Sequence, residues 1–384
     1  MPARIRHDIL FTSWYSGLGG GETDLITLAR QLADTPYHPH LLLAHEGQLG
    51  AVWREMGLPV HIVPYRGVTT YFIPRLWMHL PSAYRIAQVV RQHHIRLIHS
   101  DYHTLPMATA AARRAGVPIV WTVHGWWFRP HWWQRGFFRR MDGTVARSHA
   151  IRDGFLGHPP FMPPARVPVV YSGVDTGRFH PTIAGDDLRA ELALAPTTPL
   201  VAMVARFQPV KGHHTFQALV RLVARQHPDA HFVVAGGDVF GVAADDAYKQ
   251  DILATARTDS LLRDRLHYLG FREDVERVLA SADVVVCPSQ FESYGKVNLE
   301  AMACATPVVS TNQGGPRETV IDGETGFLVA PDDVQAFAER VCALLSDADQ
   351  RQRMGQAGQQ HVRQHFSAQA TTAAYLRLFQ NHLD

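Results

Sequence analysis

Residues 284–303 read VVVCPSQFESYGKVNLEAMA, an apolar run followed by a polar loop and the first turns of a helix. The β-branched run predicts a buried strand, and we expect the helix to begin near residues 294–296. Glu292 then precedes the helix and Glu300 lies inside it, where side chains lean back toward the helix N-terminus. A single surface glutamate is usually solvated, but this spacing and setting let both carboxylates face one crevice and bind sugar hydroxyls.

Short apolar runs alternate with helix-length segments on both sides of this stretch, which predicts a doubly wound α/β pattern that occurs twice. In the first half, the expected strands span residues 9–12, 41–44, 60–63, 97–99, 119–123, 144–146 and 167–171. In the second half, they span residues 200–205, 232–235, 266–269, 284–287, 307–310 and 326–329.

The chain of 384 residues is long enough for two domains. We expect an N-terminal domain over residues 1–180, a linker over 181–198 that contains prolines and a Gly-Asp-Asp run, and a C-terminal domain over 199–365. The last segment, residues 366–384, carries Tyr375, Leu376 and Phe379 at helical spacing and is expected to pack as a helix.

Composition excludes several classes of protein. Hydrophobic residues make up 46% and charged residues 19%, which is typical of a globular protein. No apolar run approaches about 18 residues, so we expect no membrane span, and the N-terminus has no secretory pattern. Three cysteines without C-x-x-C spacing argue against a cysteine zinc site or a disulfide framework, and they favour a cytoplasmic protein.

The charge is distributed unevenly along the chain. The first 178 residues contain 19 Arg and 10 acidic residues, a net charge of +9, while the remainder carries −7. All eight Trp also lie in the first 133 residues. A basic half indicates an anionic partner such as a phospholipid, a phosphorylated acceptor or a nucleic acid.

Two cations stand just beyond the first strand of the second half. Arg206 follows residues 200–205, and Lys211 comes five residues later, near the start of a helix. Ligands of α/β sheets bind at such strand ends, so these cations could neutralise a diphosphate. The alternative is a solvated surface pair.

Glycine turns follow two other strands. Gly19 and Gly20 belong to a glycine run before a helix, and Gly314 and Gly315 follow residues 307–310. Their N–H groups could bind an anion, or the glycines could serve tight turns alone. Phe271, after residues 266–269, could stack on a base or belong to the core.

Together, these residues resemble the retaining glycosyltransferases of family 4. The similarity rests on Gly19-Gly20-Gly21-Glu22, Thr122-Val123-His124-Gly125, Ser172-Gly173-Val174-Asp175, Arg206 with Lys211-Gly212, the E-x7-E pair Glu292/Glu300, and Gly314-Gly315-Pro316-Arg317-Glu318. The resemblance implies the GT-B fold, in which two Rossmann-like domains face a central cleft and the C-terminal helix crosses back to the N-terminal domain.

The resemblance also implies the roles of individual residues. Arg206 and Lys211 would bind the diphosphate of a nucleotide sugar, Glu300 the ribose and Glu292 the transferred sugar. His124 would lie near the reacting sugar, and the N-terminal domain would bind a glycan, glycolipid or small-molecule acceptor. The implied reaction is transfer of a hexose-type sugar with retention of anomeric configuration.

No cofactor or metal is expected, because the two cations Arg206 and Lys211 can stabilise the leaving group. No nucleic-acid partner is expected either. The alternatives are a sugar-nucleotide epimerase or isomerase of the same architecture and a non-catalytic protein that binds a sugar nucleotide.

The segment from Trp126 to Arg140 contains seven aromatic residues and four Arg but no acid. Such a composition suits peripheral contact with an anionic membrane, here the inner face of the plasma membrane, or stacking on acceptor sugars. The remaining alternative is a helix whose aromatic residues belong to the core.

Overall fold

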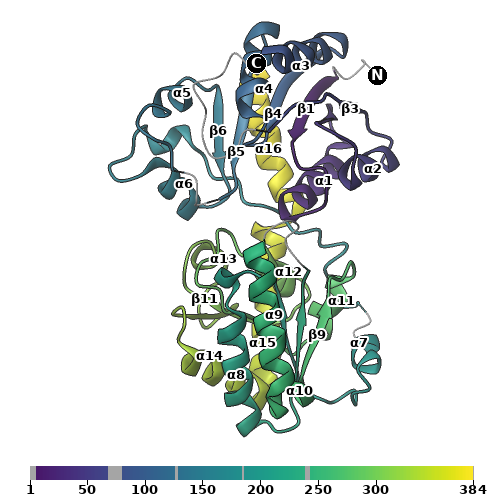
Figure 1. The fold of residues 1–384 in the computed structure, drawn as a ribbon, viewed down its shortest axis with the longest axis vertical. Coiled ribbons are helices and arrows are strands. Elements are labelled where there is room, and N and C mark those ends of the chain that lie inside the picture. Colours follow the sequence, from purple (N-terminus) through teal and green to yellow (C-terminus); the bar gives the residue numbers. More distant parts are fainter. Residues whose placement is uncertain (1–5, 68–79, 126–128, 184–185, 238–242, 384) are drawn as a thin grey trace. The chain divides into compact units, whose positions relative to one another are not determined.

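A computed structural model describes residues 6–67, 80–125, 129–183, 186–237 and 243–383 of the chain (Figure 1). The chain divides into two compact units. Unit 1 comprises Met1–Gly173 and Ala368–Asp384, and unit 2 comprises Val174–Ser367. Each unit contains one six-stranded sheet within the described residues.

The sheet of unit 1 is parallel throughout its described pairings and has the order β3-β2-β1-β4-β5-β6. Its strands are β1 (His7–Ser13), β2 (Tyr37–Leu43), β3 (Val60–Ile62), β4 (Ile95–Ser100), β5 (Ile119–Val123) and β6 (Gly143–Ala146). Its helices are α1 (Gly20–Leu32), α2 (Gln48–Glu55), α3 (Leu80–Gln92), α4 (Leu105–Ala115), α5 (Arg135–Arg139), α6 (His149–Leu156), the 3₁₀ helix η2 (Pro164–Arg166) and α16 (Ala368–Leu383).

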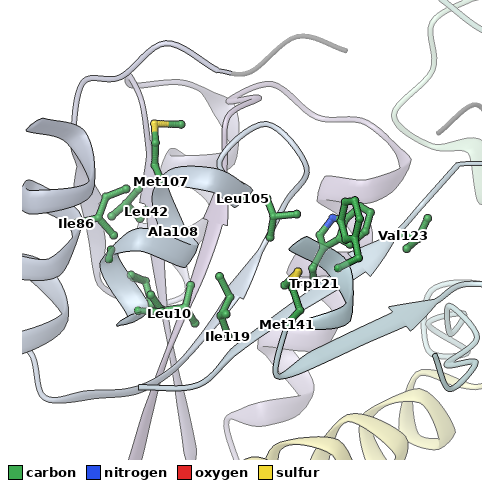
Figure 2. Close-up of a cluster of buried hydrophobic side chains, with 14 of the residues drawn as sticks. Leu10, Leu42, Ile86, Leu105, Met107, Ala108, Ile119, Trp121, Val123 and Met141 are labelled. Atoms are coloured by element: carbon green, nitrogen blue, oxygen red, sulfur yellow. The ribbon is translucent and has the colours of Figure 1, made fainter. Parts of the chain in front are cut away.

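Both faces of this sheet are buried, because successive strand residues point to opposite sides. Leu10 of β1 belongs to a core formed with α3 and α4, which Figure 2 shows with Leu42, Ile86 and Trp121. Phe11, the next residue of β1, belongs to a second core on the other face, formed with α1, α2 and α16.

The C-terminal helix α16 is part of unit 1, although it follows unit 2 in the sequence (yellow in Figure 1). Tyr375 and Phe379 are 1% and 0% exposed, and they pack beside Phe11. The Tyr375 hydroxyl also lies 3.2 Å from the Thr122 hydroxyl of β5. The aromatic spacing that predicted a packed final helix thus reflects one of the two cores of unit 1.

The sheet of unit 2 is also parallel and has the order β12-β11-β10-β7-β8-β9. Its strands are β7 (Leu200–Val204), β8 (His231–Ala235), β9 (Leu266–Gly270), β10 (Val284–Cys287), β11 (Val308–Thr311) and β12 (Gly326–Val329). Its helices are α7 (Asp186–Glu191), the 3₁₀ helix η3 (Pro209–Lys211), α8 (His213–Gln226), α9 (Ala243–Thr258), α10 (Ser260–Arg265), α11 (Val275–Ser281), α12 (Lys296–Ala303), α13 (Pro316–Thr319), α14 (Val334–Ser346) and α15 (Ala348–His365).

The boundary between the units lies earlier in the sequence than residue 180, where we expected it. The chain enters unit 2 after Gly173, and the Arg178 guanidinium donates to Glu276 of α11 over 2.9 Å. Residues 181–198, expected as a linker, include α7. Arg189 of α7 donates to the Asp283 carboxylate over 2.9 Å, so this segment is packed on unit 2.

The strand expected over residues 167–171 is wrong. This segment forms only a bridge in which Val169 pairs with Ala146 at the end of β6. Pro168 has no N–H to donate, which limits a ladder at this edge of the sheet.

Candidate active site

The strand order of unit 2 reverses between β7 and β10, and α/β sheets bind ligands at such a point. Arg206 and Lys211 follow β7, whereas Glu292 follows β10. The two loops touch, since the Gln290 N–H donates to the Val210 carbonyl oxygen over 2.9 Å. The fold therefore brings together groups that lie far apart in the sequence.

Two glycines with positive φ allow the loop after β10 to approach the loops after β7 and β11 closely. Gly212 has a φ of +74°, and a Cβ there would lie 2.1 Å from the Pro288 carbonyl oxygen. Gly314 has a φ of +78°, and a Cβ there would lie 1.9 Å from the Glu292 carbonyl oxygen. Any side chain at either position would force the loops apart.

Lys211 and Glu292, predicted separately from the sequence, form a direct ion pair. The Lys211 ammonium donates to Glu292 Oε1, which also accepts from the Ser289 hydroxyl over 3.0 Å. Burial alone would lower the pKa of Lys211, but the Glu292 carboxylate outweighs it and the pKa is raised. Lys211 therefore remains a cation at the edge of the sheet.

This ion pair has bonding capacity left for a ligand. Among the described residues, the side-chain contacts of Glu292 all end on Oε1. Oε2 can then accept from a ligand hydroxyl, and the Lys211 ammonium, with three donors, can bind an anion as well as Glu292.

Arg206 supplies a second cation near Lys211. Its side chain is exposed, while its carbonyl oxygen accepts from His213 Nε2 over 3.0 Å. The His213 ring stacks on Phe207 with centroids 4.7 Å apart. These contacts fix the backbone of the loop and leave the guanidinium open to an anionic ligand.

Glu300 lies in the second turn of α12, as the sequence predicted for its helix. Its side chain is largely buried, and Oε1 lies 3.9 Å from the Lys296 ammonium one turn earlier. Lys296 is thus a third cation beside the predicted site, and it partly neutralises Glu300.

Two other predicted residues of unit 2 have surroundings that bear on the alternatives expected for them. The Gly315 N–H donates to the Glu292 carbonyl oxygen over 2.9 Å, so this group is occupied within the protein rather than offered to an anion. Phe271 is 71% exposed beside Gly237, which places its ring on the surface and not in the core. It lies past β9, at the outer end of the same sheet edge.

In unit 1, Gly19 and Gly20 lie at the N-terminus of α1, directly after the β1 loop. A Cβ on Gly20 or Gly21 would meet no described atom within 4 Å. Packing therefore does not require glycine at positions 20 and 21, in contrast to position 314. The exposed helix N-terminus can admit a ligand close to the backbone.

His124 follows β5 and is open to solvent. Arg147 follows β6, is 4% exposed and lies 3.6 Å from Asp24 Oδ2 on α1. Arg147 and Asp24 line a pocket together with Ser172 and Tyr375.

Sequence reasoning missed Arg147, Asp24 and Asp101. Asp101 follows β4, where the strand order of unit 1 reverses, and accepts from Thr12 Oγ1 over 3.1 Å and from the Trp14 N–H over 3.2 Å. This carboxylate fixes the loop after β1. The available signal was position alone, because Arg147 directly follows the strand expected over residues 144–146 and Asp101 comes two residues after the strand expected over 97–99.

The aromatic and arginine-rich segment after His124 divides between surface and core. Trp126, Trp127 and Phe128 lie outside the described residues. Trp132 and Trp133 are 80% and 44% exposed, whereas Phe138 of α5 is 1% exposed. Core packing therefore applies to Phe138 and not to Trp132 or Trp133, and α5 itself spans only Arg135–Arg139. No described helix is both long and apolar enough to cross a bilayer.

Comparison with protein families matches both halves of the chain. Residues 18–178 match the model "Glycosyltransferase Family 4", and residues 185–361 match "Glycosyl transferases group 1". Alpha-maltose-1-phosphate synthase of Mycolicibacterium smegmatis is 32% identical over 383 aligned residues, which cover 92% of each chain.

One further relative matches only about half of this chain, and one solved structure matches nearly all of it at low sequence identity. D-inositol 3-phosphate glycosyltransferase of Mycobacterium sp. (strain JLS) is 42% identical over 189 residues, 48% of this chain and 40% of the relative. The crystal structure of Anabaena HepE with UDP and glucose superposes with a TM-score of 0.79 at 23% identity, covering 97% of this chain and 99% of HepE. The latter likeness concerns the fold.

Proposed function

The chain belongs to the GT-B glycosyltransferases, with a family 4 region followed by a group 1 region, and from this membership we propose that it transfers a hexosyl group from a nucleotide diphosphate sugar to an acceptor hydroxyl with retained anomeric configuration. The observation that carries this proposal is the cluster of Arg206, Lys211 and Glu292 between β7 and β10. The HepE structures contain UDP or UDP-glucose, which supports a donor of this class.

Each residue of the cluster has a defined task in this proposal. As the bond between the sugar and the diphosphate breaks, negative charge grows on the departing phosphate, and the fixed cations Arg206 and Lys211 stabilise it. Glu292 Oε2 accepts from a sugar hydroxyl, and Glu300 accepts from the ribose. Phe271 flanks the base. Because the two cations supply the positive charge, turnover needs no divalent metal.

The acceptor binds unit 1 and carries a phosphate group. Support comes from the exposed N-terminus of α1 at Gly19 and Gly20, from Arg147 in the neighbouring pocket, and from the net charge of +9 on the first 178 residues. The two named relatives above include a phosphorylated sugar or inositol in their names. A phosphorylated small molecule and a phosphate-linked lipid share this chemistry.

A lipid-linked acceptor would place the enzyme at a membrane. We propose peripheral contact with an anionic bilayer at the inner face of the plasma membrane. The exposed rings of Trp132 and Trp133, with the exposed Arg129 and Arg140 nearby in the sequence, suit the interface between headgroups and acyl chains.

The test combines UDP-, GDP- and ADP-linked hexoses with sugar phosphates, inositol phosphates or polyprenyl phosphate in buffer containing EDTA. Products are identified by mass spectrometry, and the anomeric configuration by NMR. We expect a glycosylated acceptor with the anomeric configuration of the donor. Inverted configuration, or turnover that EDTA abolishes and a divalent ion restores, would refute that part of the proposal.

The same experiment separates the alternative functions. Conversion of the sugar nucleotide without any acceptor would indicate an epimerase or isomerase, and binding without turnover of any donor would indicate a non-catalytic protein. Repeating the assay with Arg206→Ala tests the role of this cation. Arg225→Ala is the matched control, because Arg225 is an exposed arginine in the last turn of α8, away from the proposed site.

A further inference from the structure

A second cluster of titratable side chains lies around β2 and β3 of unit 1 and contains none of the residues of the proposed site. Asp8, His38 and His61 are the second residues of β1, β2 and β3, His40 is the fourth residue of β2, and His93 immediately follows α3. Asp8 and His38 lie near the amino ends of their strands, whereas His40 lies in the middle of β2 and His61 pairs with Leu42. The residues of the proposed unit 1 site instead follow the carboxyl ends of β1, β5 and β6.

Three of these imidazoles come close enough to share one ion. His40 Nδ1 lies 3.0 Å from His61 Nε2, and the His61 and His93 rings have centroids 4.4 Å apart. One ring nitrogen from each of His40, His61 and His93 falls within 4.8 Å of the other two. Two imidazole nitrogens bound to one tetrahedral Zn²⁺ are about 3.3 Å apart, so small ring movements would suffice.

The hydrogen bonds of His40 direct one of its nitrogens toward this point. His40 is 5% exposed, and its Nε2 lies 3.0 Å from Asp8 Oδ1. A carboxylate accepts only, so His40 donates from Nε2 and its Nδ1 carries a lone pair facing His61. A carboxylate behind a histidine is the usual outer partner of a metal ligand.

We propose that His40, His61 and His93 bind one divalent transition-metal ion, with Zn²⁺ as the best fit, and that Asp8 orients His40. Three neutral imidazoles suit Zn²⁺, and a water molecule completes the four-coordinate site. His61 Nε2 must turn its own lone pair to the ion, which a neutral imidazole achieves by moving its proton to Nδ1. The bound ion ties β2 and β3 to the turn between α3 and β4.

A neighbouring triad of Asp8, His38 and His40 is less suitable. The Arg6 guanidinium lies 2.8 Å from His38 Nδ1 and 3.1 Å from Asp8 Oδ1. This triad already has a cation, which would repel a metal ion. The ion is therefore assigned to the side of His40 that faces His61 and His93.

Unit 2 offers a matched control. His231 Nδ1 lies 2.9 Å from His267 Nε2, with the rings stacked, much like His40 and His61. The outer nitrogen of His231 faces the Arg265 guanidinium at 3.2 Å instead of a carboxylate. Among the described residues this pair also has no third ligand within reach.

The experiment uses the full chain without a histidine tag, stripped with chelator, exchanged into chelator-free buffer and titrated with Zn²⁺ by calorimetry. We expect one Zn²⁺ per chain and a rise of several degrees in melting temperature. His61→Gln and His93→Gln should each weaken binding at least tenfold, and Asp8→Asn should weaken it about 10- to 100-fold. His267→Gln should bind like the wild type.

Circular dichroism without metal confirms that each variant is folded, and His93→Gln serves if His61→Gln does not fold. The inference is overturned if the wild type takes up no stoichiometric Zn²⁺, or if both folded ligand variants bind it with wild-type affinity. The cluster would then be a set of stacked neutral imidazoles.

Discussion

Glu292 is the residue on which most of the proposed chemistry converges. It holds Lys211 through Oε1 and leaves Oε2 for the transferred sugar, whereas Glu300 lies on α12 beside Lys296. Replacing Glu292 should therefore impair sugar transfer, whereas replacing Glu300 should impair binding of the nucleotide.

We predict that Glu292→Gln lowers kcat/KM for transfer about 10- to 100-fold, as expected for a lost charge-assisted hydrogen bond, while the affinity for the bare nucleotide diphosphate stays within a factor of about three. The amide keeps the shape of the side chain, and Lys211 stays free to bind phosphate. Glu300→Gln should weaken binding of the bare nucleotide about tenfold. Calorimetry with the nucleotide diphosphate checks both, and equal losses in the two variants would contradict the assignment.

Gly20 provides a second prediction, because a Cβ there meets nothing in the described protein. Gly20→Ala should leave the free energy of unfolding unchanged or raise it by up to about 1 kcal/mol, since alanine favours the helix. Its methyl group should nevertheless raise the KM for the acceptor at least fivefold by entering the ligand's space. Gly154→Ala in α6, equally unhindered, is the control for KM. If the acceptor KM of Gly20→Ala is unchanged, Gly20 does not lie against the acceptor and has only a structural role in the turn.

The sequence predicted the chemical type of these residues better than their contacts. The E-x7-E pair and the strand ends placed Glu292, Glu300, Arg206 and Lys211 correctly on loops and helix. The ion pair between Lys211 and Glu292 could not be predicted, because it depends on how β7 lies beside β10 across 81 positions. The exposure of Phe271 was equally undetermined, since a lone aromatic residue suits surface and core alike.

Helix α16 contributes to one of the two cores of unit 1, so its packing bears on stability. His99 of β4 lies under it, with Nε2 2.9 Å from the Thr122 hydroxyl and its ring 5.6 Å from that of Tyr375. Burial, followed by the positive charge of Arg147, lowers the pKa of His99 to about 3. This histidine must therefore remain neutral for the helix to stay in place.

Acid should consequently weaken the protein before its carboxylates titrate. Between the folded pKa of about 3 and the ordinary value near 6.5, the unfolded chain binds the extra proton, so stability falls as pH falls. We predict a loss of up to about 2 kcal/mol from His99 between pH 7 and pH 5. Urea unfolding at both pH values measures it. His99→Gln should reduce the loss of stability between the two pH values by about this amount, and exposed His45→Gln should leave it unchanged. An equal loss in His99→Gln and the wild type would contradict the prediction.

Elements were predicted well where an apolar run lies between helices, and less well at the edges of sheets. The strand expected at 167–171 is only a bridge, because Pro168 interrupts the hydrogen-bonding pattern. The histidine cluster also escaped notice, since His40, His61 and His93 come from separate elements and only the fold brings them together. The sparse cysteines argued against cysteine ligands and carried no information about imidazoles.

At the scale of the whole molecule, the basic N-terminal half and the exposed tryptophans belong to the same unit. Of the arginines in this segment, Arg139 donates to the Phe161 carbonyl oxygen over 2.8 Å, so replacing it would disturb packing. Arg129, Arg140, Trp132 and Trp133 are the better probes of a membrane surface.

We predict that the wild type sediments with anionic vesicles at low salt and is released at high salt, because basic residues near the surface each contribute about 1 kcal/mol to binding. Trp132→Ser/Trp133→Ser should reduce the bound fraction severalfold at low salt. Neutral phosphatidylcholine vesicles are the control for charge. Absence of sedimentation with anionic vesicles at low salt would restrict these rings to stacking on the acceptor.

The central claim is that sugar transfer depends on the cations between β7 and β10. The most direct measurement is acceptor-dependent release of nucleotide diphosphate in the presence of EDTA, for the wild type and for Arg206→Ala/Lys211→Ala, with Arg225→Ala as the control. We predict that release requires the acceptor, that it persists in EDTA, and that the double variant loses at least 100-fold while circular dichroism shows that it remains folded. Wild-type rates in the folded double variant would contradict the claim.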